Sequence, residues 1–175
     1  MTRILIDKQP FDFSITFSKL RELKNCDETH YNDFFECYAV KEKDYTDKAL
    51  LIYVAYLCAN LHSEDVLSED EFYSLLEENI AYIDAIYSRI YYSKINCDFA
   101  EAFTKRTRDY NNKIKLPAFT LCDLEDYYSY FVLLSGIPEN TFWNEEIPFV
   151  EAVTVNKNAV DGFLNYQQHK LLNKN

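Results

Sequence analysis

Glycine and proline are scarce in this 175-residue chain, which has only two glycines and four prolines. An all-β sandwich or barrel needs a turn about every ten residues, and such turns depend on these two residue types. Their shortage therefore disfavours that class and favours a mainly helical fold. Gly136 and Gly162 also lie too far apart to form a glycine-rich nucleotide-binding loop.

The chain also lacks the marks of secretion or membrane insertion. Its five cysteines are irregularly spaced and include no Cys-x-x-Cys pair, so we interpret them as free thiols in a reducing compartment. The opening MTRILID is too short and too soon charged for a signal peptide. The longest apolar run, Ala49 to Ala59, is too short to cross a bilayer. We expect a soluble protein of the cytoplasm.

Patterns that carry catalysis or bind a cofactor are weak. Cys26, His30 and Cys37 lie close in sequence, but a helix surface or buried thiols explain them better than a metal site does. The acidic stretch from Ser68 to Glu71 is better explained as a helix cap than as a catalytic carboxylate pair. The sequence therefore predicts no catalytic residue, no metal and no cofactor, and a non-enzymatic protein that binds other proteins. An enzyme without a recognisable motif is a minor alternative.

Basic residues are also few compared with acidic ones, and the formal net charge is −11. Such a surface repels nucleic acid and anionic membranes, and suits a basic protein partner. Residues 93–120 differ, with six basic and three acidic groups. The run from Lys105 to Lys115 could touch nucleic acid, but the surrounding negative charge favours a solvated linker, which could dock against the acidic face of the protein itself.

Hydrophobic residues, in contrast, are abundant, and their spacing defines the elements. Alternating residues predict a hairpin that turns between Asp7 and Pro10, followed by a helix capped by Ser18. A short helix around Tyr31–Val40 follows. Next, a helix from a Thr46 cap is apolar on all sides over Ala49 to Leu61, which places it at the centre of the core.

The second half is punctuated by caps and breakers. Ser68 to Glu71 forms a capping box for a helix that we expect to run to about Tyr92. After a short helix from Asp98 to Phe103, another helix begins at Asp123 and ends at Gly136. A last helix starts near Pro148 and runs towards Leu172.

These elements predict a mainly α fold: a helical bundle with a short N-terminal β-hairpin and a C-terminal helical hairpin. We divide the chain into a helical core with its hairpin (1–95), a basic connector (96–118) and a C-terminal helical hairpin (119–175).

The only tryptophan lies in the corner SGIPENTFWNEEIP, next to Phe142. Such an aromatic pair can fill the gap between two helices, which is the more common role, or remain partly exposed as an anchor for a partner. Tyr73, Tyr82 and Tyr92 flank the apolar stripe of the long helix. They can seal the edge of the core or form a contact surface.

Three stretches resemble tail assembly chaperones of long-tailed bacteriophages. They are the hairpin leading into ITFSKLRELK, the apolar helix ALLIYVAYLCANLH with the capped SEDEFYSLLEEN after it, and the GIP-x-x-x-FW run from Gly136 to Trp143. The similarity covers most of the chain as a pattern. It departs from the family in Gly162 and in a longer, more basic connector.

The resemblance implies a chaperone that binds the tape measure protein, keeps it soluble and recruits tail tube subunits through its C-terminal part. It also implies action in the host cytoplasm and absence from the mature virion. Residues 1–95 would bind the tape measure protein, and whether the chaperone is a homo-oligomer stays open. The predicted partner-binding residues are Ile137, Phe142, Trp143, Tyr73, Tyr82 and Tyr92. The rival hypothesis is an acidic DNA mimic that inhibits a nuclease or another nucleic-acid-binding protein.

Overall fold

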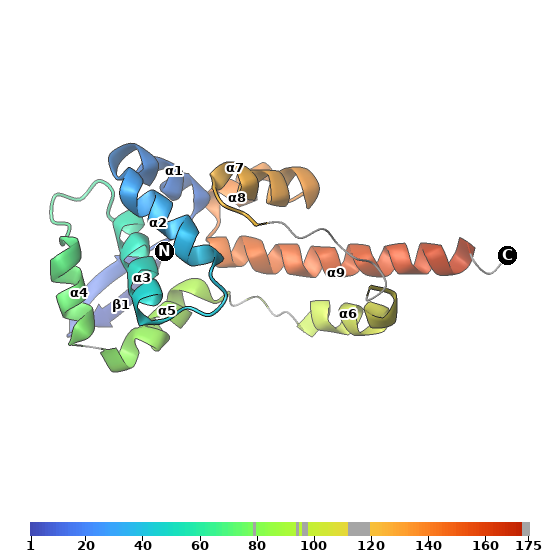
Figure 1. The fold of residues 1–175 in the computed structure, drawn as a ribbon, viewed down its shortest axis with the longest axis horizontal. Coiled ribbons are helices and arrows are strands. Elements are labelled where there is room, and N and C mark those ends of the chain that lie inside the picture. The colour runs from blue at the N-terminus through green and yellow to red at the C-terminus, as the bar shows by residue number, and fades with distance from the viewer. Residues whose placement is uncertain (79, 94, 96–97, 112–119, 173–175) are drawn as a thin grey trace.

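The computed structural model describes residues 1–78, 80–93, 95, 98–111 and 120–172. The chain is mainly helical, with a two-stranded antiparallel hairpin at the N-terminus and a long helix at the C-terminus (Figure 1). This confirms the predicted fold class. The elements in chain order are β1 Thr2–Ile6, β2 Gln9–Phe13, α1 Phe17–Cys26, α2 Glu28–Ala39, α3 Tyr45–Ala59, α4 Glu69–Glu77, the 3₁₀ turn η1 Ile80–Tyr82, α5 Ile83–Tyr91, α6 Asp98–Asn111, α7 Leu124–Tyr128, the π-helix η2 Ser129–Leu134, α8 Glu139–Asn144 and α9 Ile147–Leu172.

The hairpin has a tighter turn than expected. Asp7 and Lys8 are the two turn residues, with φ of 45° and 64°, and Ile6 pairs with Gln9. Positive φ at both positions gives the turn a hand that matches the twist of the strands. Pro10 therefore belongs to β2 and not to the turn.

The hairpin and helices α1 to α5 form the head of the molecule (Figure 1). Helix α3 runs through it and is buried along most of its length, as its apolar sequence predicts. The two predicted N-caps Ser18 and Thr46 were wrong. Asp44 caps α3 because Asp44 and Asp47 each accept a backbone N–H of the other, and Thr16 caps α1 by accepting the Lys19 N–H.

The long helix expected from Ser68 to Tyr92 is interrupted. Its capping box is confirmed, but α4 ends at Glu77 and the helix resumes in α5 after the turn η1. The apolar residues of the predicted stripe thus pack against two different parts of the head. In α4, Phe72 packs on the hairpin ring of Phe11, while α5 packs against β1 and α3.

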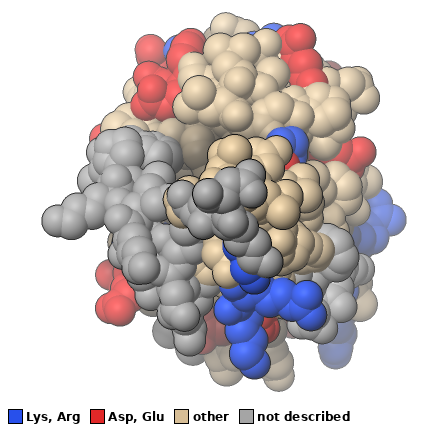
Figure 2. Space-filling view, turned by 90° about the vertical axis from the view of Figure 1, so that its right-hand side faces the viewer, with Lys and Arg blue, Asp and Glu red and all other residues tan. Residues whose placement is uncertain are grey.

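Helix α6 is longer than predicted and packs along the outer part of α9 (Figure 1). The rings of Phe103 and Phe163 meet edge to face at 5.1 Å. This part of the predicted connector is therefore a packed helix, while the basic residues Lys113 and Lys115 lie outside the described part of the chain. Figure 2 looks at the molecule from the side where α9 ends, and Lys and Arg side chains gather on the lower half of that face.

The C-terminal part has one helix more than expected. Asp123 caps α7 and Gly136 follows η2, as predicted, but α8 occupies the corner before α9. Helix α9 has 26 residues, so it is about 39 Å long. Its buried residues all lie between Ile147 and Thr154, and the rest extends away from the head as an arm (Figure 1). Among the described residues, no helix is long and apolar enough to cross a membrane.

Candidate functional site

The corner that carries Trp143 is held by a left-handed glycine and two backbone hydrogen bonds. Gly136 has φ of 66°, a conformation that favours glycine. The Ile137 N–H then donates to the Phe131 carbonyl at 2.9 Å, and the Phe142 N–H donates to the Pro138 carbonyl at 3.0 Å. Helix α8 then lies against α1.

Phe142 belongs to the core. Its side chain is 0% exposed and stacks on the Phe17 ring of α1, with centroids 4.2 Å apart and an interplanar angle of 11°. Tyr128 packs edge to face on the Phe142 ring, with the ring centroids 5.4 Å apart. Ile137 is also buried. Because burial shields both side chains, a partner can contact neither Ile137 nor Phe142 in this conformation, and the predicted role in partner binding stays with Trp143.

Trp143 is half-buried on the outer side of this cluster. Its indole N–H donates to Glu139 Oε1 at 3.2 Å, one helical turn earlier. The guanidinium of Arg21 lies 4.5 Å from the ring centroid, which is a cation–π contact. Tyr128 lies beside the ring at 5.8 Å. The indole is thus oriented on three sides and leaves part of its surface to solvent.

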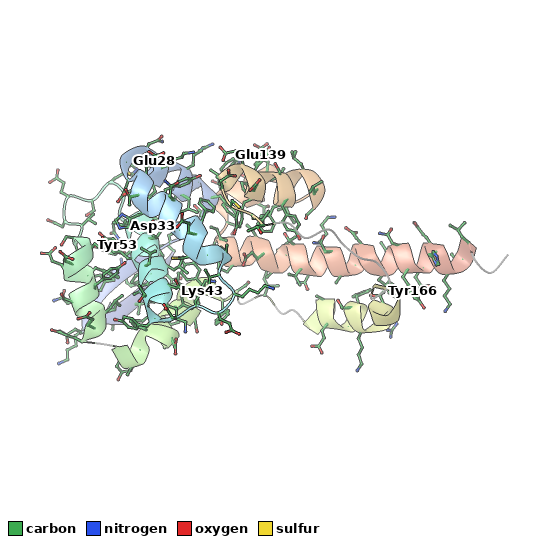
Figure 3. All side chains as sticks on the ribbon, in the orientation of Figure 1. Glu28, Asp33, Lys43, Tyr53, Glu139 and Tyr166 are labelled. Atoms are coloured by element: carbon green, nitrogen blue, oxygen red, sulfur yellow. The ribbon has the colours of Figure 1, made fainter. Side chains whose placement is uncertain are left out.

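A hollow of about 470 Å³ opens beside Trp143, between α1, α7 and α8. Leu124, Tyr128 and Trp143 give it apolar walls, and both signs of charge line it. Burial, and then the neighbouring carboxylate of Glu139, raise the pKa of Tyr128. Figure 3 shows Glu139 on the outer side of the C-terminal part, far from Tyr53 in the head. The hollow suits a side chain with an apolar body and a polar end. The residues that line it are Arg21, Lys24, Leu124, Glu125, Tyr128, Ser129, Glu139 and Trp143.

The three predicted tyrosines lie elsewhere. Tyr73 on α4 is half-buried against Tyr53, with ring centroids 5.8 Å apart. Tyr82 and Tyr92 flank α5 at its two ends and are 64% and 69% exposed. None of the three lines the hollow beside Trp143, so the structure does not bring all predicted residues into one site.

Glu146 joins the C-terminal part to the end of the hairpin. Its Oε2 accepts the Ile15 N–H at 2.7 Å and its Oε1 accepts the Ser14 hydroxyl at 2.9 Å. The Ile147 N–H then donates to the Ile15 carbonyl at 2.9 Å. A single carboxylate thus fixes the base of α9 on the head, a role that the sequence analysis missed.

A second carboxylate, Glu151, faces the head from the base of α9. Burial raises its pKa, although a hydrogen bond from Tyr38 and the charge of Lys43 act in the opposite direction. Burial, followed by the charge of Glu151, raises the pKa of Tyr38. Lys43 is held by the carbonyl oxygens of Tyr38 and Val40. The junction between arm and head therefore carries a partly buried, titratable group.

The weak metal candidates are held in other ways. His30 Nδ1 lies 2.5 Å from Asp27 Oδ2, and the Cys26 thiol donates to the Leu23 carbonyl. Within the described ranges, no group of three His, Cys, Asp or Glu side chains is placed to hold a metal ion.

The surroundings of Trp143 were only partly predictable. Glu139 stands four residues before Trp143, which places both on one face of a helix once α8 is recognised. Arg21 and Tyr128 come from other helices, and no sequence spacing indicates their approach.

No family model, curated protein or solved structure matches this chain.

Proposed function

We propose that this protein is a non-enzymatic chaperone of phage tail assembly, which binds the tape measure protein and recruits tail tube subunits. The proposal joins the sequence resemblance to two features that support protein binding, the exposed part of α9 and the partly exposed Trp143. It places the protein in the host cytoplasm during assembly and outside the finished virion.

The observation that carries the proposal is the arm. Fully buried residues occur only in the first two turns of the 26-residue helix α9; farther along, α6 packs on it, but part of its surface stays exposed. Leu164 and Leu171 are 52% and 67% exposed, and their spacing of seven residues places them on one face. Exposed apolar side chains on one face of a helix support binding in the groove of a partner or beside a partner helix.

Trp143 supports the same proposal from the other side of the C-terminal part. Tryptophan and arginine are enriched at the energetic centres of protein interfaces, and here they are stacked beside an open hollow. We assign recruitment of the tube subunit to Trp143 and the arm. We assign binding of the tape measure protein to residues 1–95, whose acidic surface suits a basic client.

The test is a pull-down of tagged protein from cells that also express the neighbouring reading frames. The wild type is expected to recover a long helical protein and a smaller tube-like protein. Trp143→Ala, and separately Leu164→Ser with Leu171→Ser, should lose the tube-like protein and keep the long one.

Matched controls change exposed residues next to each site. Asn144→Ala controls for α8, and Asn165→Ser with Gln168→Ser controls for the arm; both should recover both partners. Circular dichroism of each variant checks that the helices are retained. Recovery of a nuclease or DNA-binding protein that salt releases would replace the chaperone proposal with the DNA mimic. Recovery of neither partner by the folded wild type would refute it.

A further inference from the structure

The two strands of the hairpin differ in what their outer edges offer. The two-residue turn makes Ile6 and Gln9 a hydrogen-bonded pair, and such pairs alternate along an antiparallel ladder. Arg3 and Leu5 therefore direct their N–H and C=O groups away from β2. Two features agree with this register: Leu5 faces Pro10, which has no N–H, and the Arg3 and Asp12 side chains form an ion pair of 2.6 Å across the strands.

The outer edge of β2 is closed. Pro10 has no N–H to offer, the Asp12 carbonyl accepts the Asn60 side-chain amide at 3.3 Å, and the Ser14 N–H donates to the Ala55 carbonyl at 3.0 Å. The outer edge of β1 has no such cover. Within the described part of the chain, no hydrogen bond is made by the outward backbone groups of Arg3 and Leu5. An open strand edge selects an extended backbone as its partner.

Two hollows lie beside β1, one along α5 and the other where the end of α5 meets the base of α9. One, of about 280 Å³, is lined by Ile4 to Asp7, by Tyr82 of η1 and by α5 from Ala85 to Arg89. The other, of about 350 Å³, is lined by residues that include Thr2, Arg89, Tyr92, Phe149 and Glu146, whose carboxylate is already bound by Ser14 and Ile15. The exposed rings of Tyr82 and Tyr92 stand at the far ends, one in each hollow. A strand added to β1 would direct alternate side chains into these hollows.

Of the described residues, Arg89 alone lines both hollows. Its side chain is exposed, and the described residues give it no ion pair or hydrogen bond. We propose that the outer edge of β1 binds an extended segment of a partner protein as a third strand, with an acidic side chain on Arg89 and an apolar side chain on either side of it. The spacing from one apolar residue to the other is four positions, or about 13 Å.

A second copy of this chain is a poorer occupant. The strand β1, with the sequence TRILI, has no acidic residue to place on Arg89. Two copies would also bring together two chains with a formal net charge of −11 each, which opposes self-association. The edge of β1 is separate from the Trp143 corner, so this proposal does not depend on the identity of the tail proteins.

The test uses the full chain and a blocked peptide of about seven residues, with valine, glutamate and valine at alternate positions and threonine between them. Amide hydrogen exchange is followed by NMR. In the free protein, the Arg3 and Leu5 amides should exchange much faster than those of Ile4 and Ile6, which bond to β2. Peptide at millimolar concentration should slow exchange at Arg3 or Leu5 and leave Ile4 and Ile6 unchanged.

A charge swap tests the acidic position. Arg89→Glu should weaken the glutamate peptide by about tenfold, and a peptide with lysine in place of glutamate should bind this variant better than the wild type. Lys41→Glu, an exposed charge change elsewhere on the head, should alter neither affinity. Leu5→Pro removes one outward N–H, and binding should fall if circular dichroism shows the fold retained. The proposal is overturned if the peptide leaves Arg3 and Leu5 exchange unchanged, if the swap has no effect, or if both amides are already protected in a concentration-dependent dimer.

Discussion

Replacing Phe142 with alanine separates the core half of the aromatic pair from its exposed half. The Phe142 ring is fully buried and stacked at 4.2 Å on Phe17, so its removal leaves a cavity bounded by rings from α1, α7 and η2. A buried Phe→Ala change costs about 3–5 kcal/mol. These rings sit on separate helices that already pack against one another and cannot close freely, so we expect about 4 kcal/mol within that range.

Trp143→Ala removes a half-buried ring and should cost less, about 1–2 kcal/mol from lost apolar burial. Both free energies of unfolding are measured by urea titration. Far-UV circular dichroism is the probe, because Trp143→Ala removes the sole tryptophan and with it the tryptophan fluorescence. An unchanged slope with denaturant checks that the unfolding reaction is the same. Coupling between Phe17→Leu and Phe142→Leu should be about 0.5–1.5 kcal/mol. Equal losses for Phe142→Ala and Trp143→Ala would refute the division of the pair into core and surface.

Three further predictions concern a turn, a titratable carboxylate and the thiols. Gly136→Ala should destabilise by about 1–2 kcal/mol in urea titrations because φ is positive there, whereas Gly162→Ala in open space on α9 should stabilise by about 0.5–1 kcal/mol; the opposite signs would contradict the assigned backbone. Burial raises the folded-state pKa of Glu151 above 4.5, so the protonated carboxyl contributes stability below pH 4.5, and this contribution is lost as pH rises through the raised pKa. The free energy of unfolding should therefore fall less steeply with rising pH in Glu151→Gln than in the wild type, and the same steepness in both would contradict this. Cys58 is buried and its pKa is raised by that burial, so a thiol reagent should modify the exposed Cys26 in the native protein and reach Cys58 only after unfolding, as peptide mass mapping would show.

The sequence predicted those elements whose signals are local. The alternating apolar residues of the hairpin, the all-round apolar helix α3, the Asp123 cap and the left-handed Gly136 all follow from neighbouring residues. The break after Glu77 was missed because Ile80 and Ile83 continue the three- and four-residue spacing, so the pattern gives no warning of a 3₁₀ turn.

Long-range pairings could not be predicted. Helix α6 has a polar sequence with as many basic as acidic groups, and its packing on α9 is visible only through pairs such as Phe103 and Phe163. The same limit applies to Arg21 over Trp143 and to Glu146 on the hairpin. In each case the sequence holds the two partners but not their approach, because the approach depends on how distant helices pack.

The Glu146 junction also bears on how the chain is made. Ser14 and Ile15 meet their acceptor 132 and 131 positions later. At about 5–20 residues per second on the ribosome, the emerging hairpin waits about 7–26 s for that carboxylate. Through this interval the Phe17 ring lacks Phe142, its stacking partner, as well. The nascent N-terminal half thus emerges with an exposed apolar surface, and the rate of translation sets when its last folding step can take place.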